Sequence, residues 1–230
     1  MDPKPLADGL WVIDGPLKRL GIEFGHRMTV IRGSRGIVLH SPVEHGEALH
    51  EALARLGPVQ AVLAPSLFHD LYFPRWIERY PEAVFLAAPG FRAAHPRLAD
   101  AFGGEITAAT LEGLDAGLDT VWVEGMPRVN ECVVLHRPSR TLIVADLLFN
   151  FPEARGAWRR MFLSLNQSYG GPSCSRLFRL MVRDRGRFRG SVQRILELDF
   201  DRVVMGHGTV IERGGRDQLR NVCSRVLQGR

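Results

Sequence analysis

Two short apolar segments of the sequence each end at a residue type that binds metal ions in proteins. In TLIVADLLFN, Asp146 follows a run of aliphatic residues, and in DRVVMGHGTV, His207 follows Val203–Met205. Short runs of β-branched and aliphatic residues bounded by turn formers are typical of buried strands. A carboxylate or an imidazole where such a strand ends lies at the rim of a sheet, where functional side chains gather. Asp and His are also ligands that a divalent metal ion accepts, so the two segments predict a metal site.

Both residues also have a structural interpretation. Gly206 and Gly208 flank His207 and let the backbone turn sharply and approach a ligand closely. A histidine in such a turn can instead hydrogen-bond a backbone carbonyl. Asp146 can cap the segment that follows it, because Asp is a common capping residue. The sequence leaves these alternatives open, and we favour the metal site for both residues.

The composition is that of a protein with a substantial core. The chain has 230 residues, 45% of them hydrophobic, which suffices for one large domain or two small ones. No stretch approaches the roughly 18–20 uninterrupted apolar residues of a membrane span, and the polar start of the sequence lacks the apolar core of a signal peptide. Three cysteines lie far apart without a CxxC pair. They are typical of reduced thiols, so we expect a cytoplasmic protein.

The net charge of +5 is unevenly distributed. From Arg155 to Arg194 there are ten arginines and one acidic residue, Asp184. This Arg-rich segment can attract phosphates or anionic surfaces, although a solvated helical face is the simpler interpretation. Few aromatic residues alternate with the arginines, which argues against nucleic acid as the partner. We therefore expect a small anionic substrate or ligand, and the sequence does not fix the oligomeric state.

The order of the expected elements excludes a regular alternation of strands and helices. Residues 153–198 are predicted to be mostly helical around a GGPS break at 170–173. A Rossmann sheet requires regular alternation, whereas a sandwich of two sheets with outer helices accommodates the observed order. Strands are expected over 10–17, 28–32, 37–41, 59–65, 83–90, 120–125, 131–138, 141–146 and 203–206, and helices over 45–57, 70–81 and from about 215 onward.

This arrangement resembles the metallo-β-lactamase fold over nearly the whole chain. The segments that carry the resemblance are APSLFHDLYFPRW, NECVVLHRPSRTLIVADLLFNFPE and FDRVVMGHGTVI, and they are also similar to the DUF4336 branch of that superfamily. The resemblance implies an α+β fold: a four-layer αβ/βα sandwich of two mixed β-sheets with helices on the outer faces. It implies one domain over residues 1–230, with an Arg-rich helical insertion at about 153–198.

The sequence departs from the superfamily at its main metal-binding motif. Active members usually carry THxHxDH after the second buried strand, and here the corresponding residues 64–70 read APSLFHD. Pro65 and Leu67 stand where the first two histidines are expected, and their side chains cannot bind metal. His69 and Asp70 supply the following pair in reversed order.

A further histidine of the superfamily is also missing. In the segment MPRVNECV, Asn130 or Glu131 stands near its place. The resemblance therefore predicts a degenerate site with one divalent ion, Zn²⁺ in first place and Fe²⁺ or Mn²⁺ as alternatives, or with none. The ligands that it predicts are His69, Asp70, Asp146 and His207.

The function that follows is a metal-dependent hydrolase of an ester, lactone, thioester or phosphoester. Asp70 is the predicted catalytic residue, as the fourth ligand or as the base that accepts the proton of the attacking water. Structural interpretations compete here too, because Asp70 can cap a helix starting near Leu71 and His69 can hydrogen-bond within a partly buried loop. The alternative function is a non-catalytic relative that binds an anionic ligand or a protein partner, and stoichiometric metal separates the two.

Overall fold

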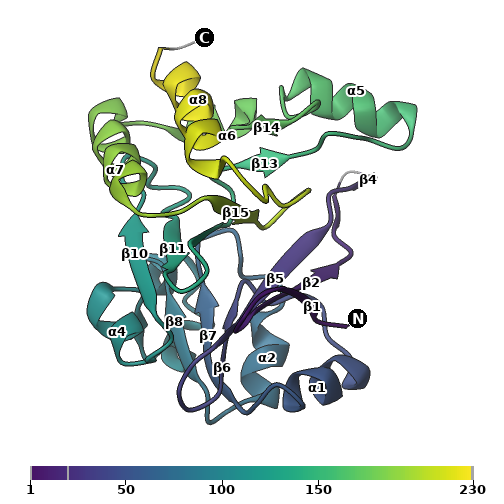
Figure 1. Ribbon diagram of the computed structural model, residues 1–230. Coiled ribbons are helices and arrows are strands. Elements are labelled where there is room, and N and C mark those ends of the chain that lie inside the picture. Colours follow the sequence, from purple (N-terminus) through teal and green to yellow (C-terminus); the bar gives the residue numbers. More distant parts are fainter. Residues whose placement is uncertain (1, 20, 229–230) are drawn as a thin grey trace.

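The computed structural model describes residues 2–19 and 21–228. Within these residues, two large mixed β-sheets pack face to face between outer helices (Figure 1). The first sheet has the order β1-β2-β5-β6-β7-β8-β9. Its strands are antiparallel from β1 to β6 and parallel from β6 to β9. The strands are β1 (Lys4–Ala7), β2 (Leu10–Gly15), β5 (His26–Arg32), β6 (Ile37–His40), β7 (Val59–Ala64), β8 (Val84–Ala87) and β9 (Gly104–Glu105).

The second sheet has the order β10-β11-β12-β15, antiparallel except for the parallel pair β12 and β15. Its strands are β10 (Leu118–Trp122), β11 (Cys132–His136), β12 (Thr141–Val144) and β15 (Arg202–Met205). Two short antiparallel pairs stand apart from the large sheets, β3 (Lys18–Arg19) with β4 (Ile22–Glu23) and β13 (Phe149–Asn150) with β14 (Pro172–Ser173).

Helices cover the outer face of each sheet. In Figure 1, α1 and α2 lie below the first sheet, whereas α7 and α8 lie against the second. The helices are α1 (Glu47–Ala54), α2 (Phe73–Arg79), α3 (Phe91–Ala94), η1 (Ala99–Ala101), α4 (Ala108–Glu112), α5 (Ala157–Leu165), α6 (Arg176–Met181), α7 (Arg185–Glu197) and α8 (Gly215–Gln228). None of the helices in the described residues is long and apolar enough to cross a membrane.

The alternation of side chains along the strands explains the layers. In β6, Leu39 points to the cluster that contains Trp76 of α2, whereas its neighbour Val38 points to the cluster between the sheets. In β12, Val144 points to the cluster under α7 and α8, and Ile143 joins Val38 between the sheets. Since successive residues of a strand face opposite sides, strands that are apolar throughout bury both faces. The predicted four-layer αβ/βα fold is confirmed.

The segment from 153 to 198 departs in one detail from the expectation of helices around a break. Helices α5, α6 and α7 are present, but the GGPS residues contain strand β14, which pairs with β13 through Phe149 and Ser173. This pairing holds the segment beside the loop that follows β12. The assignment of one domain to residues 1–230 stays a prediction.

Candidate metal centre

Asp146 and His207 lie side by side because of the register of the second sheet. Strands β12 and β15 are parallel, with Val144 opposite Met205. Each candidate ligand follows the last residue of its strand by two positions, so equal offsets place the two side chains next to each other. The Nε2 atom of His207 lies 3.6 Å from Oδ1 of Asp146.

His69 joins this pair from the loop after β7. Its Nε2 atom lies 3.3 Å from Oδ2 of Asp146. One ligand atom from each of His69, Asp146 and His207 lies within 4.8 Å of the other two, and all three side chains are buried. The structure thus brings together three of the four predicted ligands.

Both imidazoles are held by their second ring nitrogen. Nδ1 of His207 lies 2.6 Å from the carbonyl oxygen of Gly25, to which it donates, because a carbonyl can only accept. Nδ1 of His69 is hydrogen-bonded to the hydroxyl of Ser41. In each ring Nε2 therefore faces Asp146. Metal-binding histidines commonly have their other ring nitrogen fixed in this way, so the donor set fits a divalent ion.

The electrostatics of the cluster favour a negative carboxylate. Burial alone would raise the pKa of Asp146, but His69, His207 and His26 outweigh burial and lower the pKa below its usual value. For His69 burial acts in the opposite direction and lowers the pKa, but the neighbouring Asp146 carboxylate outweighs burial, so the pKa of His69 is raised. For His207 burial prevails and the pKa is lowered. A buried anion faced by imidazoles is what a metal-binding site presents to a cation.

Glu131 supports the loop that carries Asp146. The side chain is fully buried, and its two carboxylate oxygens accept hydrogen bonds from the backbone N–H groups of Ala145 at 2.7 Å and Asp146 at 2.9 Å. Burial and the nearby Asp146 raise the pKa of Glu131. The carboxylate lies outside the cluster of ligand atoms, so the structure gives Glu131 a positioning role where the sequence offered only proximity.

Two further residues of the site, His26 and Ser41, are not among the predicted ligands. The ring of His26 lies 5.1 Å from that of His69 and 5.6 Å from that of His207. Nε2 of His26 lies 3.0 Å from the hydroxyl of Ser41, which thus bridges His26 and His69. Ser41 has a φ of 59°, in the left-handed region, where surrounding contacts must hold a residue other than glycine. Only the folding of β5 and β6 against the loop after β7 brings these residues together.

The glycines beside His207 are required by close backbone approach. A Cβ on Gly208, which has a φ of 93°, would lie 2.1 Å from the carbonyl oxygen of Asn150. A Cβ on Gly206 would lie 2.9 Å from the carbonyl oxygen of Ala145 and 3.2 Å from Cε1 of His69. The GHG sequence therefore lets the loop after β15 pack tightly against the loop after β12.

Asp70 is the predicted ligand that the structure does not bring to the cluster. Its carboxylate is 41% exposed and lies 3.4 Å from Nδ1 of His95. It borders a different cavity, with Pro74 and Pro96. The side chain does not cap α2 either, because the residue before that helix is Tyr72. Directly after His69 the chain turns, and this turn directs Asp70 away from His69 and toward α3.

A polar cavity of about 170 Å³ opens at the cluster. Its wall contains His69, Asp146 and His207 together with His26, and Arg19 borders it from β3. No arginine between 155 and 194 lines this cavity, so the anion-binding role considered for the Arg-rich segment has no support at this site.

Several solved structures are similar to this chain over nearly its whole length. One is a metallo-β-lactamase from Pontibacter korlensis (TM-score 0.67, 14% identity, 100% of this chain and 99% of that chain). Another is a metallo-β-lactamase from Erythrobacter litoralis (TM-score 0.68, 14% identity, 97% and 96%). A third is a fragment of a putative diflavin flavoprotein from Nostoc sp. PCC 7120 (TM-score 0.71, 16% identity, 99% and 97%). This chain therefore has the metallo-β-lactamase fold.

Sequence comparisons add no closer relationship. No protein-family model matches the chain, and no curated protein matches it. The narrower resemblance to the DUF4336 branch stays a prediction. At identities this low the fold is what is shared, and the function must be argued from the site.

Proposed function

We propose that this chain is a metal-dependent hydrolase with one divalent ion held by His69, Asp146 and His207. The observation that carries the proposal is the convergence of their three ligand atoms within 4.8 Å, in a buried site whose imidazoles are fixed through Nδ1. When bound, such an ion lowers the pKa of a water molecule toward neutrality and polarises a carbonyl or phosphoryl group. Zn²⁺ suits two imidazoles and one carboxylate best, and Fe²⁺ and Mn²⁺ are alternatives.

The other residues of the polar cavity hold the ligands and the substrate. The Ser41 hydroxyl is hydrogen-bonded to both His69 and His26 and so holds the ring of His69, and Glu131 fixes the backbone at Asp146. Arg19, at the rim of the cavity, offers a guanidinium to an anionic group of the substrate. In hydrolysis the water oxygen bonds to the carbonyl carbon or to phosphorus, the bond to the leaving group breaks, and the water proton goes to the leaving group. Esters, lactones, thioesters and phosphoesters all meet this requirement without a further reactant.

Turnover with added metal tests the proposal. Purified protein would be assayed with p-nitrophenyl acetate, a γ-lactone, a thioester and bis(p-nitrophenyl) phosphate in the presence of Zn²⁺, Mn²⁺ or Fe²⁺. We expect hydrolysis of at least one class, with Asp146→Asn and His207→Ala each reducing kcat/KM by about 100-fold or more. As a control, Asp119→Asn, which removes an exposed partner of Arg137, should leave the rate unchanged. A folded, metal-loaded protein that hydrolyses none of the four classes would contradict the proposal.

Asp70 provides a separate arm of the same assay. The sequence predicts a ligand or base at this position, whereas the carboxylate pairs with His95. We expect Asp70→Asn to retain at least a third of the activity. A loss as large as that of Asp146→Asn would place Asp70 in the reaction after all.

The competing proposal is a protein that binds a ligand without turnover. It is favoured by Pro65 and Leu67, which stand where the resemblance expects metal-binding histidines and leave fewer ligands than active relatives have. Under this alternative the protein holds no stoichiometric metal, and the polar cavity binds an anion through Arg19.

A further inference from the structure

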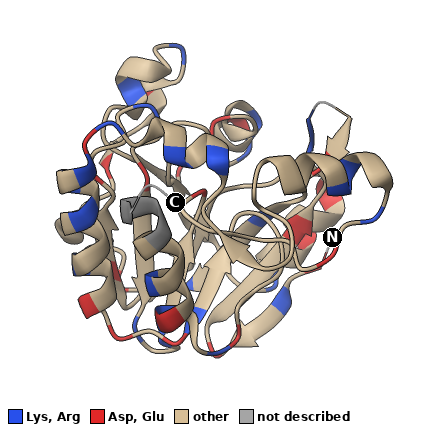
Figure 2. Ribbon diagram, turned by 90° about the horizontal axis from the view of Figure 1, so that it is seen from above, with Lys and Arg blue, Asp and Glu red and all other residues tan. Residues whose placement is uncertain are grey.

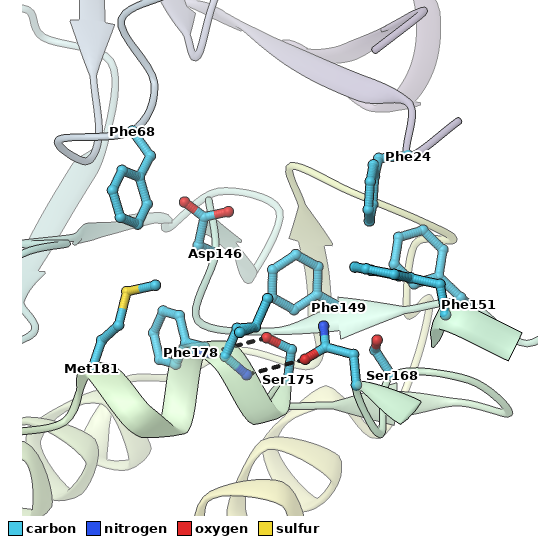
Figure 3. Close-up of a pocket in the computed structure, with 12 residues that line it drawn as sticks. Phe24, Phe68, Asp146, Phe149, Phe151, Ser168, Ser175, Phe178 and Met181 are labelled. Atoms are coloured by element: carbon cyan, nitrogen blue, oxygen red, sulfur yellow. Dashed lines mark hydrogen bonds between the residues drawn. The ribbon is translucent and has the colours of Figure 1, made fainter. Parts of the chain in front are cut away.

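A second cavity, of about 170 Å³, opens on the other side of Asp146 (Figure 3). Figure 3 shows the Asp146 carboxylate at its wall, with Phe68 to one side and Phe149 below. The cavity collects side chains that lie far apart in the sequence, from the loop after β4 to the end of α6. Its lining residues are mainly apolar: Phe24, Phe68, Asp146, Phe149, Phe151, Phe162, Asn166, Ser168, Ser175, Leu177, Phe178 and Met181.

The aromatic walls are already packed in place. The ring of Phe24 packs edge-to-face with Phe162 and with Phe151, with ring centroids 5.8 Å and 6.5 Å apart, respectively. Phe149 stacks on Phe151 with 6.3 Å between the ring centroids. It also stacks on the ring of the candidate ligand His207, with 5.7 Å between the centroids and an interplanar angle of 13°. The wall of the apolar cavity therefore contacts the metal centre through Phe149, and the packed rings hold its shape without a ligand.

Three polar side chains along this cavity are hydrogen-bonded to the backbone. The side-chain oxygen of Asn166 accepts from the N–H of Leu177 at 3.0 Å, and the Ser175 hydroxyl accepts from the N–H of Phe178 at 3.2 Å. The Ser168 hydroxyl donates to the carbonyl of Leu163 at 3.4 Å. Each of these side chains thus makes a hydrogen bond within the protein, and most of the remaining lining is apolar, so the cavity favours an apolar group.

The two cavities meet at residues that they share. Asp146 and Phe68 line both the apolar cavity and the polar cavity that contains His69, His207 and Arg19. A molecule that spans both places an apolar group on one side of Asp146 and a polar or anionic group on the other. The bond between its two parts then lies at the candidate metal centre.

We propose that the substrate of this site is an ester, thioester or lactone whose acyl group carries an apolar chain or ring that sits in the phenylalanine-lined cavity. This proposal rests on the proposed function and narrows its substrate class. An apolar cavity of about 150 Å³ accommodates a benzene ring. The acyl group is thus expected to end in a phenyl ring or an aliphatic chain of similar size, and the leaving group faces Arg19.

Binding of a neutral probe tests the cavity without any metal or turnover. Fluorobenzene would be titrated into the full-length protein, treated with chelator, and followed by fluorine NMR. We expect saturable binding that Leu177→Asp weakens by about tenfold or more. Leu177 lines the cavity, is 52% exposed and lies in the first turn of α6, where an acidic residue is tolerated.

Leu180→Asp is the matched control. This residue lies on the same helix, is 66% exposed and does not line the cavity, so its substitution should leave fluorobenzene affinity unchanged. Absence of saturable binding, or equal effects of the two substitutions with the fold intact, would overturn the inference.

A second measurement separates this inference from the proposed function. With metal added, kcat/KM of p-nitrophenyl esters should rise from acetate to hexanoate and phenylacetate, and Leu177→Asp, unlike Leu180→Asp, should abolish this rise. If fluorobenzene binds as expected but no ester is hydrolysed, the proposed function fails and the apolar site stands. If acetate is hydrolysed but longer acyl groups gain nothing, the proposed function stands and this inference fails.

Discussion

The two cavities that share Asp146 are built in different ways. The polar cavity takes its ligands from loops directly after strands β7, β12 and β15, so the two large sheets set their positions. The apolar cavity takes most of its wall from 149–181, a segment of short helices and the short strand pair β13 and β14 outside the two large sheets. In Figure 1 this segment, with α5 and β13, projects beside the second sheet. The two sheets thus position the candidate metal ligands, whereas the segment after Asp146 builds the cavity that we propose holds the acyl group of the substrate.

The charges follow the same division. Figure 2 shows the blue Lys and Arg positions concentrated on the outer helices and loops. Arginines of 155–194 are absent from the lining of both cavities within the described residues. Most of these arginines are exposed, whereas Phe178 and Phe188 of the same segment are buried. The Arg-rich composition therefore describes a surface, as the simpler interpretation of the sequence expects.

The largest effect is expected from breaking the contact between the ligand loops. Gly208→Ala adds a Cβ that would lie 2.1 Å from the carbonyl oxygen of Asn150, at a φ of 93°. Because the obstacle is backbone and cannot rotate away, we expect a loss of about 3–5 kcal/mol in the free energy of unfolding. Gly214→Ala is the control, because Gly214 has a φ of 68° and nothing within 4 Å; strain alone should cost about 1–2 kcal/mol. Equal losses in urea denaturation would show that the close approach at Gly208 does not matter.

A smaller loss is expected at the carboxylate beneath Asp146. Glu131→Gln keeps the shape but turns an amide N–H₂ toward one of the two backbone N–H groups that Glu131 now accepts. We expect about 1–3 kcal/mol of destabilisation and metal affinity lowered by about 10–100-fold. Glu124→Gln removes only a surface ion pair with Arg194, so it should change stability and metal affinity by little. Unchanged metal affinity in Glu131→Gln would contradict a role of Glu131 in positioning Asp146.

Acid should weaken the first sheet behind the polar cavity. Burial, and then His69, lower the pKa of His40 to about 3, while an unfolded histidine titrates near pH 6.5. The unfolded state therefore binds more protons between these values, so His40 stabilises the protein less as the pH falls from 6.5 toward 3. His40→Leu should reduce the loss in the free energy of unfolding between pH 6.5 and pH 5 by an amount on the order of 1–2 kcal/mol. Parallel stability curves of the two proteins over this range would contradict the assignment.

The smallest effect is expected on substrate preference. Phe162→Ala removes a wall of the apolar cavity, whereas Met161→Ala changes its exposed neighbour. With metal bound, Phe162→Ala should lower the kcat/KM ratio of hexanoate to acetate esters by up to about tenfold, and Met161→Ala should leave the ratio unchanged. An equal ratio in both variants would mean that the segment after Asp146 does not contact the acyl group.

The sequence predicts the sheet-borne part of the site better than the rest. Asp146 and His207 follow apolar strands directly, so their place at the rim of a sheet can be inferred from local pattern. His26, at the start of β5, and Ser41, directly after β6, become neighbours of His69 only when the chain folds, and a local pattern cannot encode that contact. Asp70 follows His69 directly, but the turn of the backbone between them sends its side chain to His95.

The apolar cavity had no sequence signal for the same physical reason. Phe24, Phe68, Phe151 and Phe178 come from four separate segments, and each alone is indistinguishable from a core residue. The four-layer fold was predictable because strands that are apolar throughout must bury both faces. The short strand β14 was not, since its Gly- and Pro-rich sequence is typical of a turn, and its pairing with β13 alone makes it a strand.

Metal content measured by elemental mass spectrometry is the direct test of a metal centre at His69, Asp146 and His207. The protein would be purified without chelator and without a His-tag, beside the Asp146→Ala/His207→Ala double variant, with the fold of both checked by circular dichroism. We expect about one divalent ion per chain in the unsubstituted protein and none in the variant. No metal in either folded protein, or equal metal in both, would contradict a metal centre at His69, Asp146 and His207.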